Sequence, residues 1–420
     1  MPPHDPAMSA AFTTLFLIAL GLSTVLRLWL ARRHVRHIAD HRDAVPEAFR
    51  DTIALEAHQR AADYTSARVR LAVVEVLVGA AFVLALTLGG LLQAMHEAWT
   101  TLGLEGLVHG LAFIASLVLL SSAADMPFSL YRTFVIEERF GFNKVTPRLF
   151  LVDLAKGALL GAAIGLPVLA AVLWLMERMG DSWWLYVWLF WLGFNLLVLL
   201  VYPTVIAPLF NKFTPLADAS LKERIEALMA RCGFRSSGLF VMDGSKRSAH
   251  GNAYFTGFGR AKRIVFFDTL LEKLAPSEVE AVLAHELGHF RRRHVWKRIG
   301  ALALATLGFL WLLGQLIDAP WFFQGLGMQA QGTAAALALF SLAIPAFTFP
   351  LSPLLSALSR RHEYEADAYA AEQTRAEDLV AALVKLYRDN ATTLTPDPLY
   401  SAFYDSHPPA AARIAHLRSS

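Results

Sequence analysis

The sequence has almost no cysteine and little charge. Cys232 is its only cysteine, so no intrachain disulfide can form and a disulfide-stabilised secreted scaffold is excluded. Charged residues make up 17% of the 420 positions, against about 25% in an ordinary soluble domain. The net charge of +3 is too small to indicate nucleic-acid binding, and we expect no nucleic-acid partner. Apolar residues are in excess, at 55% of the chain, which excludes intrinsic disorder and indicates an integral membrane protein.

Seven apolar stretches approach the length of about 20 residues that a helix needs to cross a bilayer. The third is the weakest, because Glu105 and His109 interrupt its start. The first has the position of a signal peptide, but no basic segment precedes it and Arg32 and Arg33 follow it, so we expect a retained anchor. The seven expected spans are roughly Ala10–Leu30, Leu71–Met95, Leu104–Leu120, Leu149–Leu175, Trp184–Tyr202, Ile299–Ile317 and Thr333–Leu355.

Basic residues alternate between the loops on the two sides of these spans. The loops at 96–103 and 318–332 contain no Lys or Arg, and the loop at 176–183 contains only Arg178. The intervening loops and the C-terminal segment are rich in both. By the positive-inside rule, we expect the N-terminus outside and the C-terminus in the cytosol.

The most informative motif is His285-Glu286-Leu287-Gly288-His289, which falls on an expected helix. An HExxH motif on a helix places its two imidazoles one turn apart on one face, a spacing that suits two nitrogen ligands of Zn²⁺. Glu286, beside the first ligand, can reach the water at the metal and accept its proton. The alternative is a helix that merely carries two surface histidines, and the apolar run at 279–284 argues against it.

A third zinc ligand is expected in the segment 361–370. Glu363 can complete a His₂Glu site, and Asp367, one helical turn further on, can orient a ligand histidine by hydrogen bonding. The alternative is that these acids form a solvated helix face, which is our interpretation of Glu365. His362 is an alternative ligand, but on a helix it points about 100° away from Glu363.

These motifs occur in a recognisable order along the chain. Together they resemble the type I CAAX prenyl proteases, membrane zinc endopeptidases with seven spans, and the resemblance covers the chain from about residue 60 onward. Besides the HExxH motif and the E-x-x-x-D pattern at 363–367, it rests on Phe134–Asn143, Ser245–Phe255, Arg263–Leu271 and Tyr400–Ile414.

The resemblance implies the identity of several site residues. It implies one Zn²⁺ per chain, held by His285, His289 and Glu363, with Glu286 as general base. It places Asn252 near an edge strand that holds the substrate backbone, where the alternative is a turn asparagine.

Two further residues are assigned with alternatives left open. His407 resembles a late histidine that stabilises the oxyanion, although His-Pro-Pro also suits a helix entrance without chemistry. Arg413 is expected to bind a substrate carboxylate or to pair with a carboxylate of the site. Glu286 and His407 are thus the expected catalytic residues, and Asn252 and Arg413 the expected substrate-binding residues.

Other ionisable residues have simpler expected roles. His294 lies off the ligand face and is expected at the membrane interface, His250 on a strand edge, and Glu137 in a charged loop. Within the spans, Asp153 and Lys156 are spaced i,i+3 and can pair with each other. The resemblance offers an alternative, because a water-filled chamber between the helices would hydrate them.

The expected fold is mainly α: a polytopic membrane protein with about seven transmembrane helices and a cytosolic zincin-like metalloprotease domain with a small β-sheet. Three strands are expected, at Gly238–Asp243, Asn252–Phe258 and Arg263–Phe267, before a helix opened by a capping box of Ser277 and Glu280. We divide the chain into a membrane region at 1–208 with a cytosolic loop at 31–70, a cytosolic protease segment at 209–298, two spans at 299–357 and a C-terminal segment at 358–420.

The expected function is that of a zinc metalloendopeptidase. Its substrate is a peptide or protein, either a prenylated CaaX tail or a broader range of membrane proteins, and its other partner is the lipid bilayer. The alternatives are a metal-ion transporter and a non-catalytic membrane chaperone. The Ala-, Leu- and Arg-rich composition and the absence of a C-terminal ER-retrieval signal favour a bacterial inner membrane, and we expect a monomer.

Overall fold

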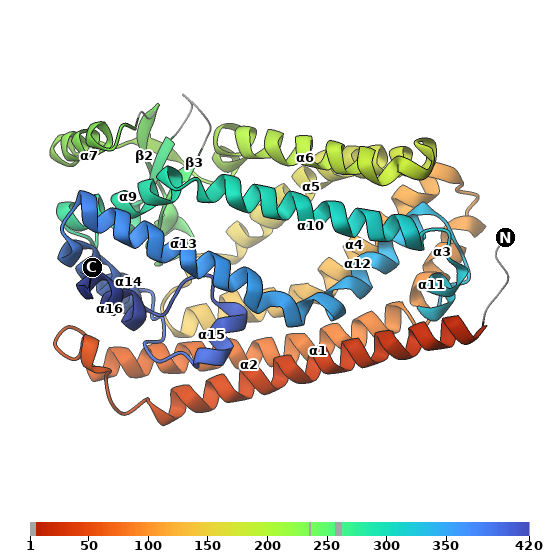
Figure 1. Cartoon of the computed structure of the whole chain (residues 1–420), viewed down its shortest axis with the longest axis horizontal. Coiled ribbons are helices and arrows are strands. Elements are labelled where there is room, and N and C mark those ends of the chain that lie inside the picture. Colours follow the sequence, from red (N-terminus) through yellow and green to blue (C-terminus); the bar gives the residue numbers. More distant parts are fainter. Residues whose placement is uncertain (1–5, 235–236, 257–262, 420) are drawn as a thin grey trace.

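The structure, a computed structural model, describes residues 6–234, 237–256 and 263–419. Long helices run side by side along its longest axis, and a small sheet lies at one end, near the C-terminus (Figure 1). The N-terminus lies at the opposite end, with the short helices α3 (Leu91–Thr101) and α11 (Pro320–Gly325). The chain therefore separates into an apolar helical body and a mixed, more polar end.

Seven helical segments in the described part of the chain are long and apolar enough to cross a membrane, as the sequence predicts. Large apolar side chains such as Leu119, Leu159 and Leu304 point outward, each at least 69% exposed, as on a surface that faces lipid rather than water. The segments are α1 (Pro6–Asp40), α2 (Leu55–Leu86), α4 (Gly106–Tyr131) with a π-helical turn to Glu137, α5 (Pro147–Arg178), α6 (Trp183–Val201) with short turns on either side, α10 (His294–Leu316), and α12 (Thr333–Thr348) running on into α13 (Ser352–Gln373).

The second span ends earlier than predicted. The apolar run continues to Met95, but α2 stops at Leu86 and a separate helix, α3, begins at Leu91. Gly90 has a φ of 76°, a left-handed conformation that glycine adopts without steric cost, so the chain turns there. A prediction from hydropathy alone extends the second span to Met95, because α3 is also apolar.

The ionisable residues of the spans pair differently from the prediction. Asp153 does not pair with Lys156; it accepts a two-pronged hydrogen bond from Arg247, with N···O distances of 2.9 and 3.0 Å. Lys156 Nζ instead donates to the carbonyl of Leu209 at 2.8 Å. The partners lie about 50 to 90 residues away along the chain, and i,i+3 spacing cannot reveal them.

The sheet has four strands in the order β1-β2-β4-β3. The central pair, β2 (Gly238–Met242) and β4 (Arg263–Phe267), is parallel, and β1 (Phe213–Pro215) and β3 (Ala253–Thr256) flank it in antiparallel fashion. The sequence predicts three of these strands but misses β1, whose three residues are too short to show alternation. The last two residues of the strand predicted at Asn252–Phe258 lie outside the described residues.

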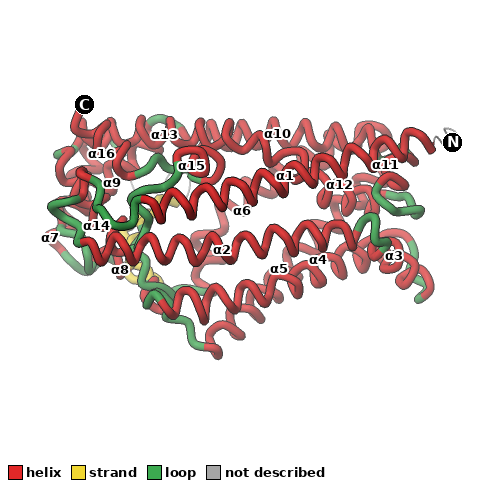
Figure 2. Tube along the Cα trace, turned by 90° about the horizontal axis from the view of Figure 1, so that it is seen from below, coloured by secondary structure: helices red, strands yellow, loops and turns green. Residues whose placement is uncertain are grey.

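Helices cover the sheet and enclose one apolar core. Phe266 of β4, Ile225 of α7 (Ala219–Arg231) and Leu283 of α9 (Pro276–Arg291) are each at most 1% exposed within it. Complete burial of such a side chain contributes about 1.5–3 kcal/mol, so this core fixes α9 on the sheet. Figure 2 shows these elements gathered at one end of the molecule, together with α8 (Asp268–Leu271), α14 (Ala376–Asp389), α15 (Pro398–Tyr404) and α16 (Ala410–Ser419).

The start of α9 differs from the predicted capping box. The helix begins at Pro276, and Glu278 Oε2 accepts a hydrogen bond from the backbone N–H of Ala275 at 2.7 Å. Ser277 and Glu280 face away from this end: Ser277 donates to Asp378, and Glu280 pairs with arginines of α7. Proline is well suited to the first helical position, which shifts the N-cap by two residues, from the predicted Ser277 to Ala275.

Candidate active site

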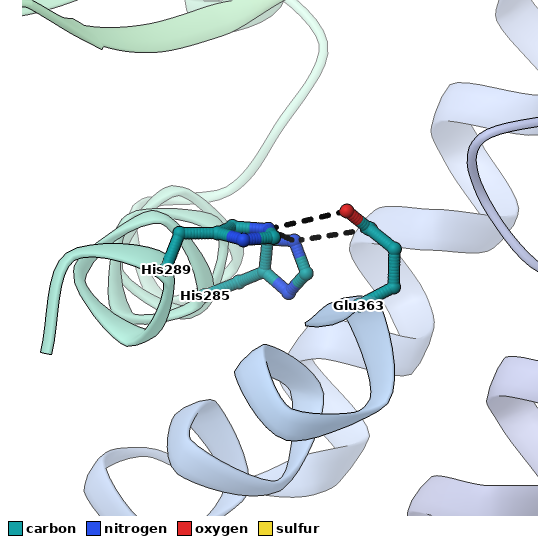
Figure 3. A group of neighbouring side chains, drawn as sticks. All are labelled: His285, His289 and Glu363. Carbon is teal, nitrogen blue, oxygen red and sulfur yellow. Dashed lines mark hydrogen bonds and ion pairs between the residues drawn. The ribbon is translucent and has the colours of Figure 1, made fainter. Parts of the chain in front are cut away.

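Helices α9 and α13 bring three side chains to one point. His285 and His289 project from the same face of α9 toward Glu363 of α13 (Figure 3). The two Nε2 atoms are 3.2 Å apart, His289 Nε2 is 3.2 Å from Glu363 Oε1, and His285 Nε2 is 3.5 Å from Glu363 Oε2. Two imidazole nitrogens and a carboxylate oxygen thus converge within a radius that one metal ion can span.

Gly288 allows the two helices to approach this closely. A Cβ at this position would lie 3.0 Å from the Cα and carbonyl oxygen of Ala366 on α13, closer than side-chain carbons normally come to backbone atoms. The glycine inside the HExxH motif therefore has a packing function, because it sets the separation between the helix of the histidines and the helix of Glu363.

The residues present fit a metal ion. Glu363 is 4% exposed, and its Oε2 atom makes no hydrogen bond of acceptable geometry within the described chain, although His407 Nδ1 lies 2.7 Å away. Leaving a buried carboxylate oxygen without a partner costs free energy, and a cation between the three side chains would satisfy it. A donor set of two imidazoles and one carboxylate, with room for a further ligand, is the pattern of catalytic zinc sites.

A buried ion pair holds His285 from the opposite side of its ring. His285 Nδ1 lies 2.8 Å from Oδ1 of Asp367, which is fully buried. Arg413 Nε donates to Asp367 Oδ2 at 2.8 Å, and its Nη2 to Oδ1 at 2.5 Å. Burial lowers the pKa of His285, but the hydrogen bonds to Asp367 and Glu363 outweigh it and raise the pKa to about 9. Nδ1 is thus engaged by Asp367, and Nε2 is the nitrogen that faces Glu363.

Of the two alternatives for Arg413, the geometry favours the pairing with a site carboxylate. Its side chain is buried, its guanidinium is bound to Asp367, and its Nη1 is 3.7 Å from Glu363 Oε2.

Glu286 is the carboxylate within the HExxH motif, and it has no partner among the described residues. It follows His285 on α9, is half-buried, and makes no hydrogen bond or ion pair with the described residues. A carboxylate that is not neutralised by a neighbouring cation remains available to accept a proton.

His407 lies on the loop between α15 and α16, and its Nδ1 reaches Oε2 of Glu363. Its side chain is 62% exposed and faces a cavity of about 820 Å³. The cavity extends between α2, α14 and α15, and its polar wall includes Arg68 and Arg132. The site therefore borders a space whose walls are partly polar and partly apolar.

Asn252 directly precedes β3, which forms one edge of the sheet and packs against α9. Its Oδ1 accepts a hydrogen bond from the N–H of Ala253 at 2.8 Å, as a turn asparagine does, and its carbonyl accepts one from Phe267 N–H at 3.0 Å. The side-chain NH₂ is left to donate elsewhere, so the geometry is compatible with both alternatives for this residue.

The structure adds to one of the simpler expectations and corrects two. His294, expected at the membrane interface, is 3% exposed, and its Nδ1 lies 3.0 Å from Nδ1 of His289. Glu365 is not merely part of a solvated face, because it also contacts His294. Glu137 accepts a hydrogen bond from Tyr64 at 2.6 Å and lies 3.6 Å from His250, rather than in a free charged loop. The sequence contains a signal for the contact of His294 that we did not use: His294 follows the second histidine of the motif, His289, by five residues.

Seven candidate membrane helices, an HExxH helix and a carboxylate on a second helix define an integral membrane metallopeptidase. Models of the CAAX prenyl protease N-terminal region with five membrane helices and of peptidase family M48 match residues 34–212 and 215–420, respectively. The chain belongs to peptidase family M48, and it is a membrane metalloendopeptidase of the type represented by Ste24p.

Individual relatives agree with this assignment. The CAAX prenyl protease 1 homolog of Arabidopsis thaliana is 40% identical over 311 residues, 73% of each chain. CAAX prenyl protease 1 of Saccharomyces cerevisiae is 37% identical over 323 residues, which are 73% of this chain and 71% of the relative. The crystal structure of S. mikatae Ste24p superposes with a TM-score of 0.89 at 31% identity, over 99% of this chain and all of the other. The predicted family, fold class and protease activity are confirmed, and these matches give no support to a transporter or a chaperone.

Proposed function

We propose that this protein is a zinc endopeptidase that removes the C-terminal residues of prenylated CaaX proteins. The observation that carries the proposal is the convergence of His285 Nε2, His289 Nε2 and a buried, unbonded oxygen of Glu363 on one point. One Zn²⁺ per chain, held by these three residues, would satisfy all three groups. The relatives named as CAAX prenyl proteases support the substrate class.

The chain's own residues perform the proton transfers. When bound, zinc supplies Lewis-acid polarisation of the scissile carbonyl and of water. Glu286 accepts a proton from the attacking water and returns it to the leaving amine, because it is the carboxylate next to a ligand that has no cationic partner among the described residues. His407, whose Nδ1 contacts Glu363, presents its other ring nitrogen to the developing oxyanion. Asp367 and Arg413 keep His285 in its ligand orientation.

The substrate backbone is held by the free edge of the sheet. Among the described strands, β3 pairs only with β4, so its other edge can offer main-chain donors and acceptors to an extended peptide. The NH₂ of Asn252 can donate to a substrate carbonyl at the beginning of this edge.

A second cavity supports a substrate that carries a lipid. It has a volume of about 550 Å³, lies between α1, α2 and α12, and is mostly apolar. It shares Glu75, Tyr400 and Tyr404 with the polar cavity that reaches His407. An apolar space next to a polar one matches an isoprenoid attached to a short peptide.

The decisive experiment compares the purified wild type with Glu286→Ala in detergent. Each receives a farnesylated CaaX peptide and its unprenylated twin, and mass spectrometry identifies the fragments. We expect the wild type to cut the farnesylated peptide faster and the variant to cut neither. Equal cleavage of the twins would favour broader membrane-protein proteolysis, and cleavage by the variant would disprove Glu286 as the base.

The proposed location is a bacterial inner membrane, with the sheet and the active site on the cytosolic side and the chain acting as a monomer. The basic loops at the end of the molecule that carries the sheet support this orientation. Single cysteines introduced at Asp43 and at Gly103 in a Cys232→Ser background would test it. In intact cells, a membrane-impermeant maleimide should label position 103 and spare position 43.

A further inference from the structure

A tight turn brings His294 back onto the ligand helix. Only Arg292 and Arg293 separate the end of α9 from α10, and Arg293 has a φ of 57° and a ψ of 32°. This left-handed conformation is rare for a residue with a Cβ and costs about 1–2 kcal/mol. It reverses the chain within two residues, so that the first side chain of α10 packs against the last ligand of α9.

His294 connects a metal ligand to a carboxylate on α13. Its Nδ1 is 3.0 Å from His289 Nδ1, and its Nε2 is 3.0 Å from Glu365 Oε2. Glu365 in turn accepts a hydrogen bond from Arg361 Nε at 3.1 Å and lies 3.8 Å from Lys297 Nζ. The positive charges of Arg361 and Lys297 thus keep the Glu365 carboxylate negatively charged.

The two contacts of His294 determine where its proton lies when His289 is a ligand. His289 faces Glu363 through Nε2, so as a neutral ligand it carries its proton on Nδ1 and donates to His294. His294 must then accept at Nδ1, which leaves its own proton on Nε2, where Glu365 accepts it. If His294 Nδ1 donated to His289 Nδ1 instead, neutral His289 would carry its proton on Nε2. That proton would block metal binding.

The same logic applies to the other ligand histidine. His285 donates directly from Nδ1 to Asp367, which Arg413 neutralises. His289 has no carboxylate at its Nδ1 within the described chain and contacts an imidazole instead. We propose that His294 is the positioning residue of His289, and that a His289–His294–Glu365 relay fixes the ring and tautomer of the second metal ligand. This inference rests on the proposed function, because it takes His289 to be a ligand.

The test measures metal binding by the full-length protein in detergent. Zn²⁺ affinity is obtained by competition with a chromophoric chelator, and the Co²⁺-loaded protein gives a visible spectrum that reports ligand geometry. His294→Phe keeps the ring volume and removes the acceptor, and we expect it to weaken Zn²⁺ binding about 10–100-fold and to shift the Co²⁺ bands. His294→Asn places an amide oxygen near the former Nδ1, and we expect it to restore most of the loss.

A matched control separates hydrogen bonding from packing. His362 stacks on His294 with ring centroids 4.1 Å apart but bonds neither His289 nor Glu365, so His362→Phe should leave affinity and spectrum unchanged.

Wild-type Zn²⁺ affinity in His294→Phe, or equal losses of affinity in His294→Phe and His294→Asn, would overturn the relay. If His294→Phe does not fold, Glu365→Gln decides: the relay requires weaker Zn²⁺ binding, and unchanged binding would overturn it. Stoichiometric zinc in His285→Ala would instead refute the proposed metal centre itself.

Discussion

At the scale of single residues, the site separates metal binding from proton transfer. Glu286 contacts none of the three proposed ligands through a hydrogen bond, so Glu286→Gln should retain one Zn²⁺ per chain while kcat falls about 10²–10⁴-fold, the usual contribution of a general base. Metal analysis of the purified variant checks that zinc is retained, and single-turnover kinetics checks the fall in rate. Loss of zinc in this variant would show that Glu286 also supports the metal centre.

Arg413 offers a second prediction at this scale. Removal of one partner of a buried ion pair costs about 3–5 kcal/mol, so Arg413→Met should lower the free energy of unfolding of the metal-free protein by that order, because it leaves the buried charge of Asp367 unpaired. Thermal unfolding measures this change. Kinetics with free-acid and C-terminally amidated peptides separates the two alternatives: we expect the ratio of their KM values to stay the same, whereas a substrate-binding Arg413 would make the ratio collapse.

Among the residues, a pair that shares one helical turn was predictable from its spacing, and Glu363 from a second motif, but most other contacts across segments were not predictable. His285 and His289 are fixed by an i,i+4 spacing, which a helix converts directly into a shared face. The contact of His294 with Glu365 joins residues 71 positions apart, and that of Asp153 with Arg247 joins residues 94 apart. No local pattern encodes such pairs, because they arise only when the helices pack.

At the scale of elements, the contact between α9 and α13 controls the site. Gly288→Ala should be destabilising by about 1–3 kcal/mol and should weaken metal binding, since its Cβ would push the helix of Glu363 away. Gly300→Ala on α10 is the control: no atom lies within 4 Å of its added Cβ, and alanine is the better helix former, so stability should stay the same or rise. Thermal unfolding and zinc titration of both variants provide the comparison, and equal behaviour would refute the packing argument.

The elements themselves follow the same division between local and distant information. Long apolar runs gave the seven spans because length and hydropathy are local properties. The break at Gly90 and the short strand β1 escaped prediction, the first because α3 continues the apolar run and the second because pairing with β2 defines it.

At the scale of the whole molecule, two cavities share wall residues, and one of them reaches His407. Gly79 of α2 lines the apolar cavity and has open space around an added Cβ. Gly79→Phe should therefore fill part of the cavity and raise KM for the farnesylated peptide, while cleavage of the unprenylated twin stays the same. Gly161→Phe on α5, equally open but outside the cavity wall, is the matched control. Parallel changes with both peptides would show that the cavity does not hold the lipid.

The two-residue turn between α9 and α10 has a mechanical consequence. Backbone hydrogen bonds from Arg292 to Gly288, from Arg293 to Phe290 and from Lys297 to Arg293 run through the turn. His294 opens α10, and its Nδ1 lies 3.0 Å from Nδ1 of His289. A tilt of α10 in the bilayer would therefore move His294 relative to the ligand ring.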